Sequence, residues 1–292
     1  MTPVNQINLS EGEVVADLLS PSKGKKRSLV EADRPPDAVQ VVRLEPADRL
    51  VALARTLDAT SSATEAELKQ STADFARFGE NCIGAASYRH RSVFQGASTA
   101  EAWSHFELIY FRDLIPVGAI RELVLDPQPA AFDLLRAEIL VTTPSSFVLP
   151  RDWRGNFGSP ERVASLEFLD VGPTHLGEYR NAMRDYCGPA AQKLVRSRRF
   201  GTFRAMETAA ILHQAPELSI EWNQVHLCEL DPEDFNGFGE EFAKAHRQDA
   251  PEESELPDAF ADLGRLRTIP RWTFNDPVIE ADTGVARVFG AD

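Results

Sequence analysis

The chain is poor in cysteine, lacks long apolar stretches and has fewer basic than acidic residues. Its three cysteines, Cys82, Cys187 and Cys228, are isolated in the sequence. This spacing is typical of neither a disulfide framework nor a zinc site, and it fits a reducing cytoplasm. No apolar run approaches the ~20 residues that a membrane-spanning helix needs. The first residues also lack the basic and apolar segments of a secretory signal. These absences predict a cytoplasmic protein.

The charge balance excludes two classes of partner. The sequence carries 31 Lys and Arg against 45 Asp and Glu, a formal net charge of −14. A surface this acidic repels phosphate backbones and anionic lipid headgroups. We therefore expect neither nucleic acid nor a membrane as a partner.

Several nucleotide, hydrolase and metal motifs are also missing. The sequence has no Gly-x-Gly-x-x-Gly and no P-loop, so it gives no support for dinucleotide or P-loop chemistry. It has no Gly-x-Ser-x-Gly, which disfavours an α/β-hydrolase. No His-x-His element is present, and no histidine is marked as a haem ligand. We therefore expect no cofactor and no metal.

Composition along the 292 residues predicts two domains with flexible ends. The polar residues 1–37 read as a flexible N-terminal arm, and 38–145 as a first folded unit. A segment rich in Pro, Gly and Ser predicts a linker over 146–162. A second unit spans 163–275, and 276–292 reads as a C-terminal tail.

The second half has the clearer pattern of elements. It alternates strands and helices in the order strand, helix, strand, strand, helix, strand: Ala164–Val171, a helix from Thr174 through Val195 interrupted at Gly188-Pro189, Phe200–Thr208, Ile220–Leu230, a helix from Asp231, and Arg267–Phe274. This order is that of a ferredoxin-like unit, an antiparallel sheet with helices on one face. The predicted fold class is α+β.

The first half shows the same order less clearly. Its predicted elements are a strand at Val39–Leu44, helices at Ala47–Leu57 and Thr64–Phe78, strands at Ile83–Phe94 and Trp103–Phe111, a helix at Phe132–Glu138 and a strand at Ile139–Thr142. A short internal sequence similarity relates Trp103–Leu108 to Trp222–Leu227, and each segment begins the third strand of its half. Two ferredoxin-like units are therefore expected.

Five short segments of the second half form a recognisable pattern: Glu178-Tyr179-Arg180, Tyr186-Cys187-Gly188-Pro189, Phe200-Gly201-Thr202-Phe203, Glu207-Thr208 and Trp222-Asn223-Gln224-Val225-His226-Leu227. In these segments the chain resembles the dimeric α/β-barrel superfamily, in particular its NIPSNAP-like and antibiotic-biosynthesis-monooxygenase-like members. The resemblance implies two sheets that face each other around a small ligand, in an intrachain or dimeric barrel, and a homodimer. The family includes cofactor-independent oxygenases, isomerases and cyclases, haem enzymes and proteins of no known activity, so the fold does not give the function.

The predicted third strand of the second half supplies the main candidate residues. Alternation places Trp222, Gln224 and His226 on one face, and Val225, Leu227 and Glu229 on the other. If the apolar face packs on the helices, the polar face lines the barrel. Such a row is explained either by a ligand pocket or by a hydrogen-bonded structural network, because unpaired buried polar groups cost about 1–3 kcal/mol each. His226 is the candidate proton shuttle, since imidazole titrates near neutrality.

Four other residues complete the candidate site. Arg204 on the neighbouring strand is placed to hold an anionic oxygen together with Gln224, or to form a salt bridge. His105 and Glu107 share a face of the first half's third strand and would lie opposite across a barrel. Tyr186 either orients an aromatic or carbonyl substrate or packs in the core.

Two functions are compatible with this pattern. The first is a cofactor-independent oxygenase, cyclase or isomerase acting on a small aromatic or polyketide-like compound of secondary metabolism. The second is a non-enzymatic binding or assembly protein with the same fold. They differ in whether the face with Trp222, Gln224 and His226 meets an open cavity or a filled core.

Overall fold

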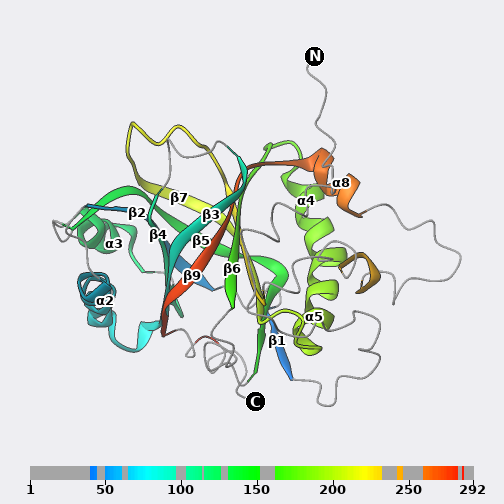
Figure 1. The fold of residues 1–292 in the computed structure, drawn as a ribbon, viewed down its shortest axis with the longest axis horizontal. Helices are drawn as coiled ribbons and strands as arrows, with labels where there is room; N and C mark the ends of the chain where they lie inside the picture. The colour runs from blue at the N-terminus through cyan, green and yellow to red at the C-terminus, as the bar shows by residue number, and fades with distance from the viewer. Residues whose placement is uncertain are drawn as a thin grey trace, which may run out of the picture.

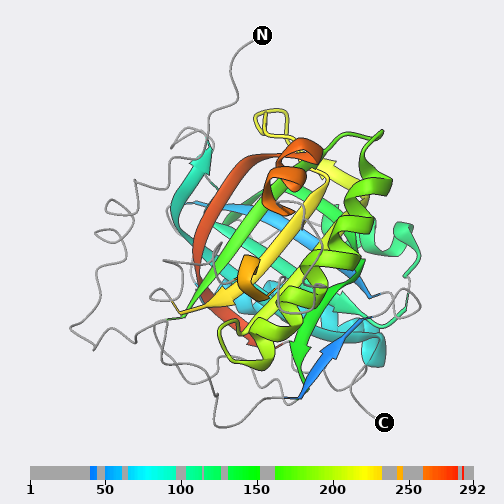
Figure 2. The same cartoon turned by 90° about the vertical axis from the view of Figure 1, so that its right-hand side faces the viewer.

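The computed structural model describes residues 40–44, 50–60, 65–96, 103–113, 115–125, 131–151, 162–231, 242–245, 259–281 and 285. The arm predicted at 1–37 lies outside these residues, as does most of the helix predicted from Asp231. The described elements form one strand-rich body with helices on two opposite sides (Figures 1 and 2).

Eight antiparallel strands close into a barrel. Their order around the ring is β5-β2-β4-β3-β9-β6-β8-β7, and β7 pairs back onto β5. The strands are β2 (Val51–Ala59), β3 (Cys82–Gly96), β4 (His105–Phe111), β5 (Phe132–Pro150), β6 (Val163–Val171), β7 (Thr202–Gln214), β8 (Gln224–Leu230) and β9 (Arg267–Ala281). A ninth strand, β1 (Val41–Arg43), pairs with the end of β5 outside the ring. The expected α+β class and barrel are confirmed, and the barrel closes within one chain.

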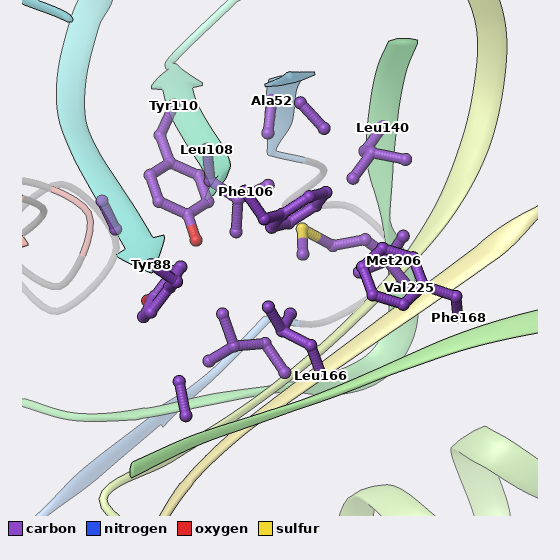
Figure 3. Close-up of a cluster of buried hydrophobic side chains, with 14 of the residues drawn as sticks. Ala52, Tyr88, Phe106, Leu108, Tyr110, Leu140, Leu166, Phe168, Met206 and Val225 are labelled. Atoms are coloured by element: carbon purple, nitrogen blue, oxygen red, sulfur yellow. The ribbon is translucent and has the colours of Figure 1, made fainter. Parts of the chain in front are cut away.

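The interior of the barrel is an apolar core. Every strand of the ring except β9 contributes a side chain to it, and Figure 3 shows many of these side chains pointing toward one another: Ala52, Tyr88, Phe106, Leu108, Tyr110, Leu140, Leu166, Phe168, Met206 and Val225. An eight-stranded barrel is just wide enough for side chains to fill it. Both faces of most strands are therefore buried, one in the barrel and one under the helices.

Helices cover the outer face on two sides. On one side lie α2 (Glu65–Ala73), the 3₁₀ segment η2 (Asp74–Asn81) and α3 (Val117–Leu125). Phe75 of η2 and Ile120 of α3 pack with outward-facing residues of β2, β4 and β5. On the opposite side lie α4 (Leu176–Ala182), η3 (Met183–Cys187), α5 (Gly188–Arg196) and α8 (Ala259–Leu266).

The predicted interruption near Gly188-Pro189 is a π-helical turn. The segment η3 lies between α4 and α5, and Pro189 enters α5 in its first turn, where a missing N–H costs little. The hydroxyl of Ser146 in β5 donates to the carbonyl oxygen of Met183 over 2.7 Å. The helix thus continues through the turn and is bonded there to the barrel wall.

Two predicted helices are strands. The structure has β2 at Val51–Ala59, where a helix was expected over Ala47–Leu57, and β5 at Phe132–Pro150, where a helix was expected over Phe132–Glu138. All positions from Val51 to Leu57 are buried, because both faces of β2 are covered. The apolar run Leu50–Ala54 is too short for its periodicity to distinguish a strand from a helix. The helix of this region is α3, which the sequence analysis did not predict.

Two predicted boundaries also move. Strand β5 extends to Pro150, so residues 146–150 belong to the barrel and not to a linker. Strand β9 continues to Ala281 and pairs with β3, so residues 276–281 are not a free tail. Beyond the strand, Val285 is buried in the barrel core.

Candidate functional site

Four polar side chains meet inside the barrel, and we call them the inner cluster: Tyr88, Tyr110, Arg204 and Glu229. The Arg204 guanidinium donates to the Tyr110 hydroxyl over 2.7 Å and to a Glu229 carboxylate oxygen over 3.2 Å. The Tyr88 hydroxyl donates to the same oxygen, Oε1, over 3.0 Å. All four side chains are fully buried, and Figure 3 shows the Tyr110 hydroxyl pointing into the barrel.

Strand alternation explains why these residues converge. Arg204 lies opposite Leu227 in the β7–β8 ladder, and Glu229 lies two residues beyond Leu227, so both share the inward face of Leu227. Tyr88 and Tyr110 come from β3 and β4 of the first half and point inward like Phe106 and Leu108. The cluster therefore joins the two halves of the chain within an apolar barrel.

A second interior network surrounds Glu138 of β5. Its carboxylate accepts hydrogen bonds from the Arg136 guanidinium at 2.8 Å, the Trp222 indole N–H at 2.7 Å and the Thr208 hydroxyl at 2.7 Å. The Arg136 guanidinium also lies over the Trp222 ring, 4.0 Å from its centroid. A partly desolvated cation over an aromatic face is attracted by the ring quadrupole. This network is fully satisfied at Glu138.

A buried acid–base group lies outside the barrel, beneath α4, and we call it the outer cluster: Glu167, Tyr179, His226 and Arg267. The Tyr179 hydroxyl lies 2.8 Å from His226 Nε2, and His226 Nδ1 lies 3.6 Å from a Glu167 carboxylate oxygen. Arg267 Nη1 lies 3.8 Å from the same oxygen of Glu167.

Burial determines which groups of the outer cluster carry a proton. It raises the pKa of Tyr179, so the hydroxyl keeps its proton and donates to His226 Nε2. Burial lowers the pKa of His226 by more than the hydrogen bond to Glu167 raises it. The neutral ring then carries its proton on Nδ1, facing Glu167. The hydrogen bond from His226, and then the charge of Arg267, hold the pKa of Glu167 low despite its burial.

The structure corrects the predicted orientation of His226. Val225 and Leu227 point into the barrel, while His226 lies under α4 against Tyr179. Gln224 shares this outer face by alternation and is buried, and its Oε1 has no hydrogen-bond partner in the described part of the chain. The prediction was wrong because the barrel interior, and not the helix layer alone, requires apolar side chains. His226 and Gln224 therefore do not share a cavity with Arg204.

The other predicted residues lie in three places. Trp222 precedes β8 and packs inside the barrel, 5.7 Å from the Trp103 ring by centroids. His105 and Glu107 point outward, where His105 contacts Phe132 and Glu107 forms a buried salt bridge. Tyr186 packs against the helix layer in η3. Of the proposed set, only Arg204 and Trp222 face the barrel interior.

The hydrogen bond that joins Tyr88 to Glu229 in the inner cluster was not predicted from the sequence. Glu229 was placed on the face of Val225 and Leu227, and an acid on an otherwise apolar strand face was the signal for a buried polar partner. Tyr88 carries no comparable signal, because its partner Glu229 lies 141 residues away.

The described residues hold neither a metal-ligand cluster nor a membrane-spanning helix. Within the ranges that the structure describes, no group of three or more His, Cys, Asp or Glu is arranged to hold a metal. Over the same ranges, no helix has the length and apolar character needed to cross a membrane.

The outer cluster predicts acid sensitivity. The folded state lowers the pKa of His226, so the unfolded chain binds more protons and this contribution to stability is lost as pH falls below about 6.5. The lowered pKa of Glu167 acts in the same direction at lower pH. We expect the free energy of unfolding, measured by urea titration, to decrease from pH 7 to pH 5 less in His226→Gln than in the unsubstituted protein. Exposed His175 supplies the control: His175→Gln keeps the original profile, and equal profiles for all three proteins contradict the assignment.

Comparison with known proteins gives structural likenesses only. No protein-family model matches the chain, and no curated protein matches it. A putative monooxygenase from Fusobacterium nucleatum has a TM-score of 0.48 at 9% identity, over 80% of this chain and 94% of that one. A mutant chlorite dismutase from Candidatus Nitrospira defluvii has 0.43 at 9%, over 82% and 95%. An anthrone oxidase-like protein has 0.42 at 12%, over 83% and 96%. These values identify neither a family nor an activity for this chain.

Proposed function

We propose that the barrel interior binds a small, largely apolar molecule that carries an acidic or enolic oxygen, with Arg204 and Tyr110 holding that oxygen. The convergence of the inner cluster from both halves carries the proposal. A buried ion pair is often no more stabilising than apolar residues of similar volume. Fold stability therefore does not account for Arg204 and Glu229 in an apolar barrel.

The proposed chemistry is that of a cofactor-independent oxygenase, cyclase or isomerase. Arg204 and Tyr110 would stabilise negative charge that develops on the bound oxygen, in a site that excludes water. Glu229, which accepts the Tyr88 hydroxyl hydrogen bond, would take up a proton from the ligand. His226 and Gln224 have no part in this proposal, because they lie on the outer face.

The strand order also supports a proposal about architecture. The first half runs β5-β2-β4-β3 and the second β9-β6-β8-β7 around the ring, so corresponding strands occupy corresponding places. We propose that each half is a ferredoxin-like unit and that the barrel is a fused pair. We also propose that the chain is affiliated with the NIPSNAP-like or monooxygenase-like members, and that whole barrels form a homodimer. Sedimentation velocity tests the homodimer.

A second candidate function follows from how completely the interior is buried. Tyr88, Tyr110, Arg204 and Glu229 are each at most 1% exposed, so a ligand enters only if interior side chains move. A filled barrel favours a non-enzymatic binding or assembly protein, in which the inner cluster fixes the pairing of the two halves.

Ligand binding separates the two candidates. We expect 2-naphthol to bind the unsubstituted protein more tightly than naphthalene does, measured by calorimetry. The double substitution Arg204→Met/Glu229→Leu removes the ion pair of the cluster. It should weaken the binding of 2-naphthol roughly 10–100-fold, which corresponds to the loss of a charged hydrogen bond, and leave the affinity for naphthalene unchanged. Arg180→Met is the control, because Arg180 bonds Glu207 on the outer surface. Absence of binding of both compounds to the unsubstituted protein would contradict the ligand proposal and favour the assembly protein.

A further inference from the structure

The strand registers relate interior positions of one half to those of the other. In each half, a path across the ladders leads from the third strand through the first strand to the last one. One such path is Leu108–Ala54–Glu138 in the first half and Leu227–Leu166–Thr273 in the second. The next is Phe106–Thr56–Arg136 and Val225–Phe168–Arg271. Arg136 therefore corresponds to Arg271, and Glu138 to Thr273.

The tryptophans complete this correspondence. Trp103 and Trp222 each stand two residues before their strand, β4 and β8. The Arg271 guanidinium lies over the Trp103 ring, 4.6 Å from its centroid, as Arg136 lies over Trp222 at 4.0 Å. Each arginine thus stacks on the tryptophan of the other half.

The first of these pairs shows what an arginine–tryptophan pair binds in this barrel. The Arg136 guanidinium and the Trp222 indole N–H both donate to the Glu138 carboxylate, at 2.8 Å and 2.7 Å. The two donors hold different oxygens, Oε2 and Oε1. The pair therefore binds a carboxylate at two points, with one N–H from each residue, and the bond from Arg136 is charge-assisted.

The second pair, Arg271 with Trp103, has no such carboxylate at the corresponding position of β9. The corresponding position is Thr273, which has no acidic group. The Trp103 side chain is 1% exposed, and its indole N–H has no hydrogen-bond partner in the described part of the chain. A buried donor left in this state costs about 1–3 kcal/mol. Arg271 has further interactions of its own, so the open donor is that of Trp103.

His90 of β3 adds a second open atom beside this pair. The His90 backbone N–H donates to the carbonyl oxygen of Ser104 over 2.7 Å, so His90 lies beside the segment that carries Trp103. Burial, and then the charge of Arg271, lower the pKa of His90. Its Nε2 is buried without a hydrogen-bond partner among the described residues, although the side chain as a whole is only partly buried. This edge of the cluster therefore borders solvent.

We infer that Trp103 and Arg271 form a binding site for the carboxylate of a small ligand, which takes the place that Glu138 occupies in the first half. His90 lies at the entry to this site. The inference does not depend on the inner cluster, which shares no residue with it. A carboxylic acid with an apolar body suits the site, because Phe168 packs against the Trp103 ring at 4.8 Å.

Indole resonances test the inference directly. The chain has four tryptophans, so a ¹⁵N-labelled sample gives four indole N–H signals, assigned by Trp→Phe variants. Acetate and benzoate are the probes, with chloride at equal ionic strength as the reference. We expect the Trp103 signal to shift saturably with either carboxylate and the Trp222 signal to stay, because Trp222 is already bonded. Arg271→Gln should weaken the response at least roughly tenfold.

A substitution at Thr273 gives an independent test in case Arg271→Gln fails to fold. Thr273→Glu supplies the missing carboxylate, so the Trp103 signal should shift without ligand and no longer respond to acetate. Thr273→Gln is the control of equal size without charge, and should not reproduce the ligand-free shift.

Three results would overturn the carboxylate site. The first is an unchanged Trp103 signal at high concentrations of acetate and benzoate. The second is an equal response of this signal to chloride. The third is a water molecule that stays bound to the Trp103 indole N–H in the presence of every carboxylate, and is then a structural water only. Failure of 2-naphthol to bind leaves these measurements unaffected, so the two proposals fail separately.

Discussion

Replacement of Glu138 by leucine is expected to lower the free energy of unfolding by about 3–5 kcal/mol, among the largest effects of any single substitution in the chain. The carboxylate accepts from Arg136, Thr208 and Trp222, and its side chain is 1% exposed. Its removal leaves the buried Arg136 charge with only the neutral acceptors Gln214 and the Trp222 carbonyl, and the buried Trp222 indole N–H without an acceptor. Urea unfolding with comparison of m-values measures the loss.

Two further variants test this expectation. Arg136→Met together with Glu138→Leu should recover much of the loss, because paired charges are then replaced by apolar groups. Glu207→Leu should cost at most about 1 kcal/mol, since its partner Arg180 is 42% exposed and turns to water. A loss below about 1 kcal/mol for Glu138→Leu alone would show that the network contributes little.

The second large effect is expected at Gly188, where α5 meets the barrel wall. A methyl group there would lie 2.0 Å from the carbonyl oxygen of Ser145, a backbone atom of β5. Gly188→Ala must therefore displace the helix or the strand, at a cost of about 3 kcal/mol. Thermal and urea unfolding measure it.

A second glycine on the same helical segment supplies the matched control. Gly177 in α4 is exposed, and a methyl group there meets no atom within 4 Å. Gly177→Ala should stabilise the protein by about 0.5–1 kcal/mol, because alanine loses less entropy in a helix. Equal effects at the two positions would refute the close contact at Gly188.

The second half was the more predictable part of the fold. Its helix and strands were predicted near their observed places, and Gly188-Pro189 marked the π-helical turn. Strand β2 was not predicted, because its apolar residues also fit helical spacing, and periodicity does not separate a short buried strand from a helix. Closure of the barrel buries both faces, and it depends on the distant pairing of β5 with β7.

The candidate site was predicted less well for a related reason. Alternation grouped Gln224 with His226 correctly, but which face points inward depends on where the larger apolar core lies. The internal sequence similarity at Trp103 and Trp222 identified two residues that do meet in the barrel. The partners of Arg204 were not predicted, since Tyr110 lies 94 residues away and belongs to the other half.

The pairing of β9 with β3 has a consequence for the order of events during synthesis. Strand β3 ends at Gly96, and its partner β9 begins only at Arg267, so the ribosome makes the partner after nearly all of the other elements. Until then the nascent first half presents an open strand edge, which invites pairing with other chains. The last strand made is therefore the one that seals the barrel, and a chain released before β9 has both β3 and β6 without the neighbour between them.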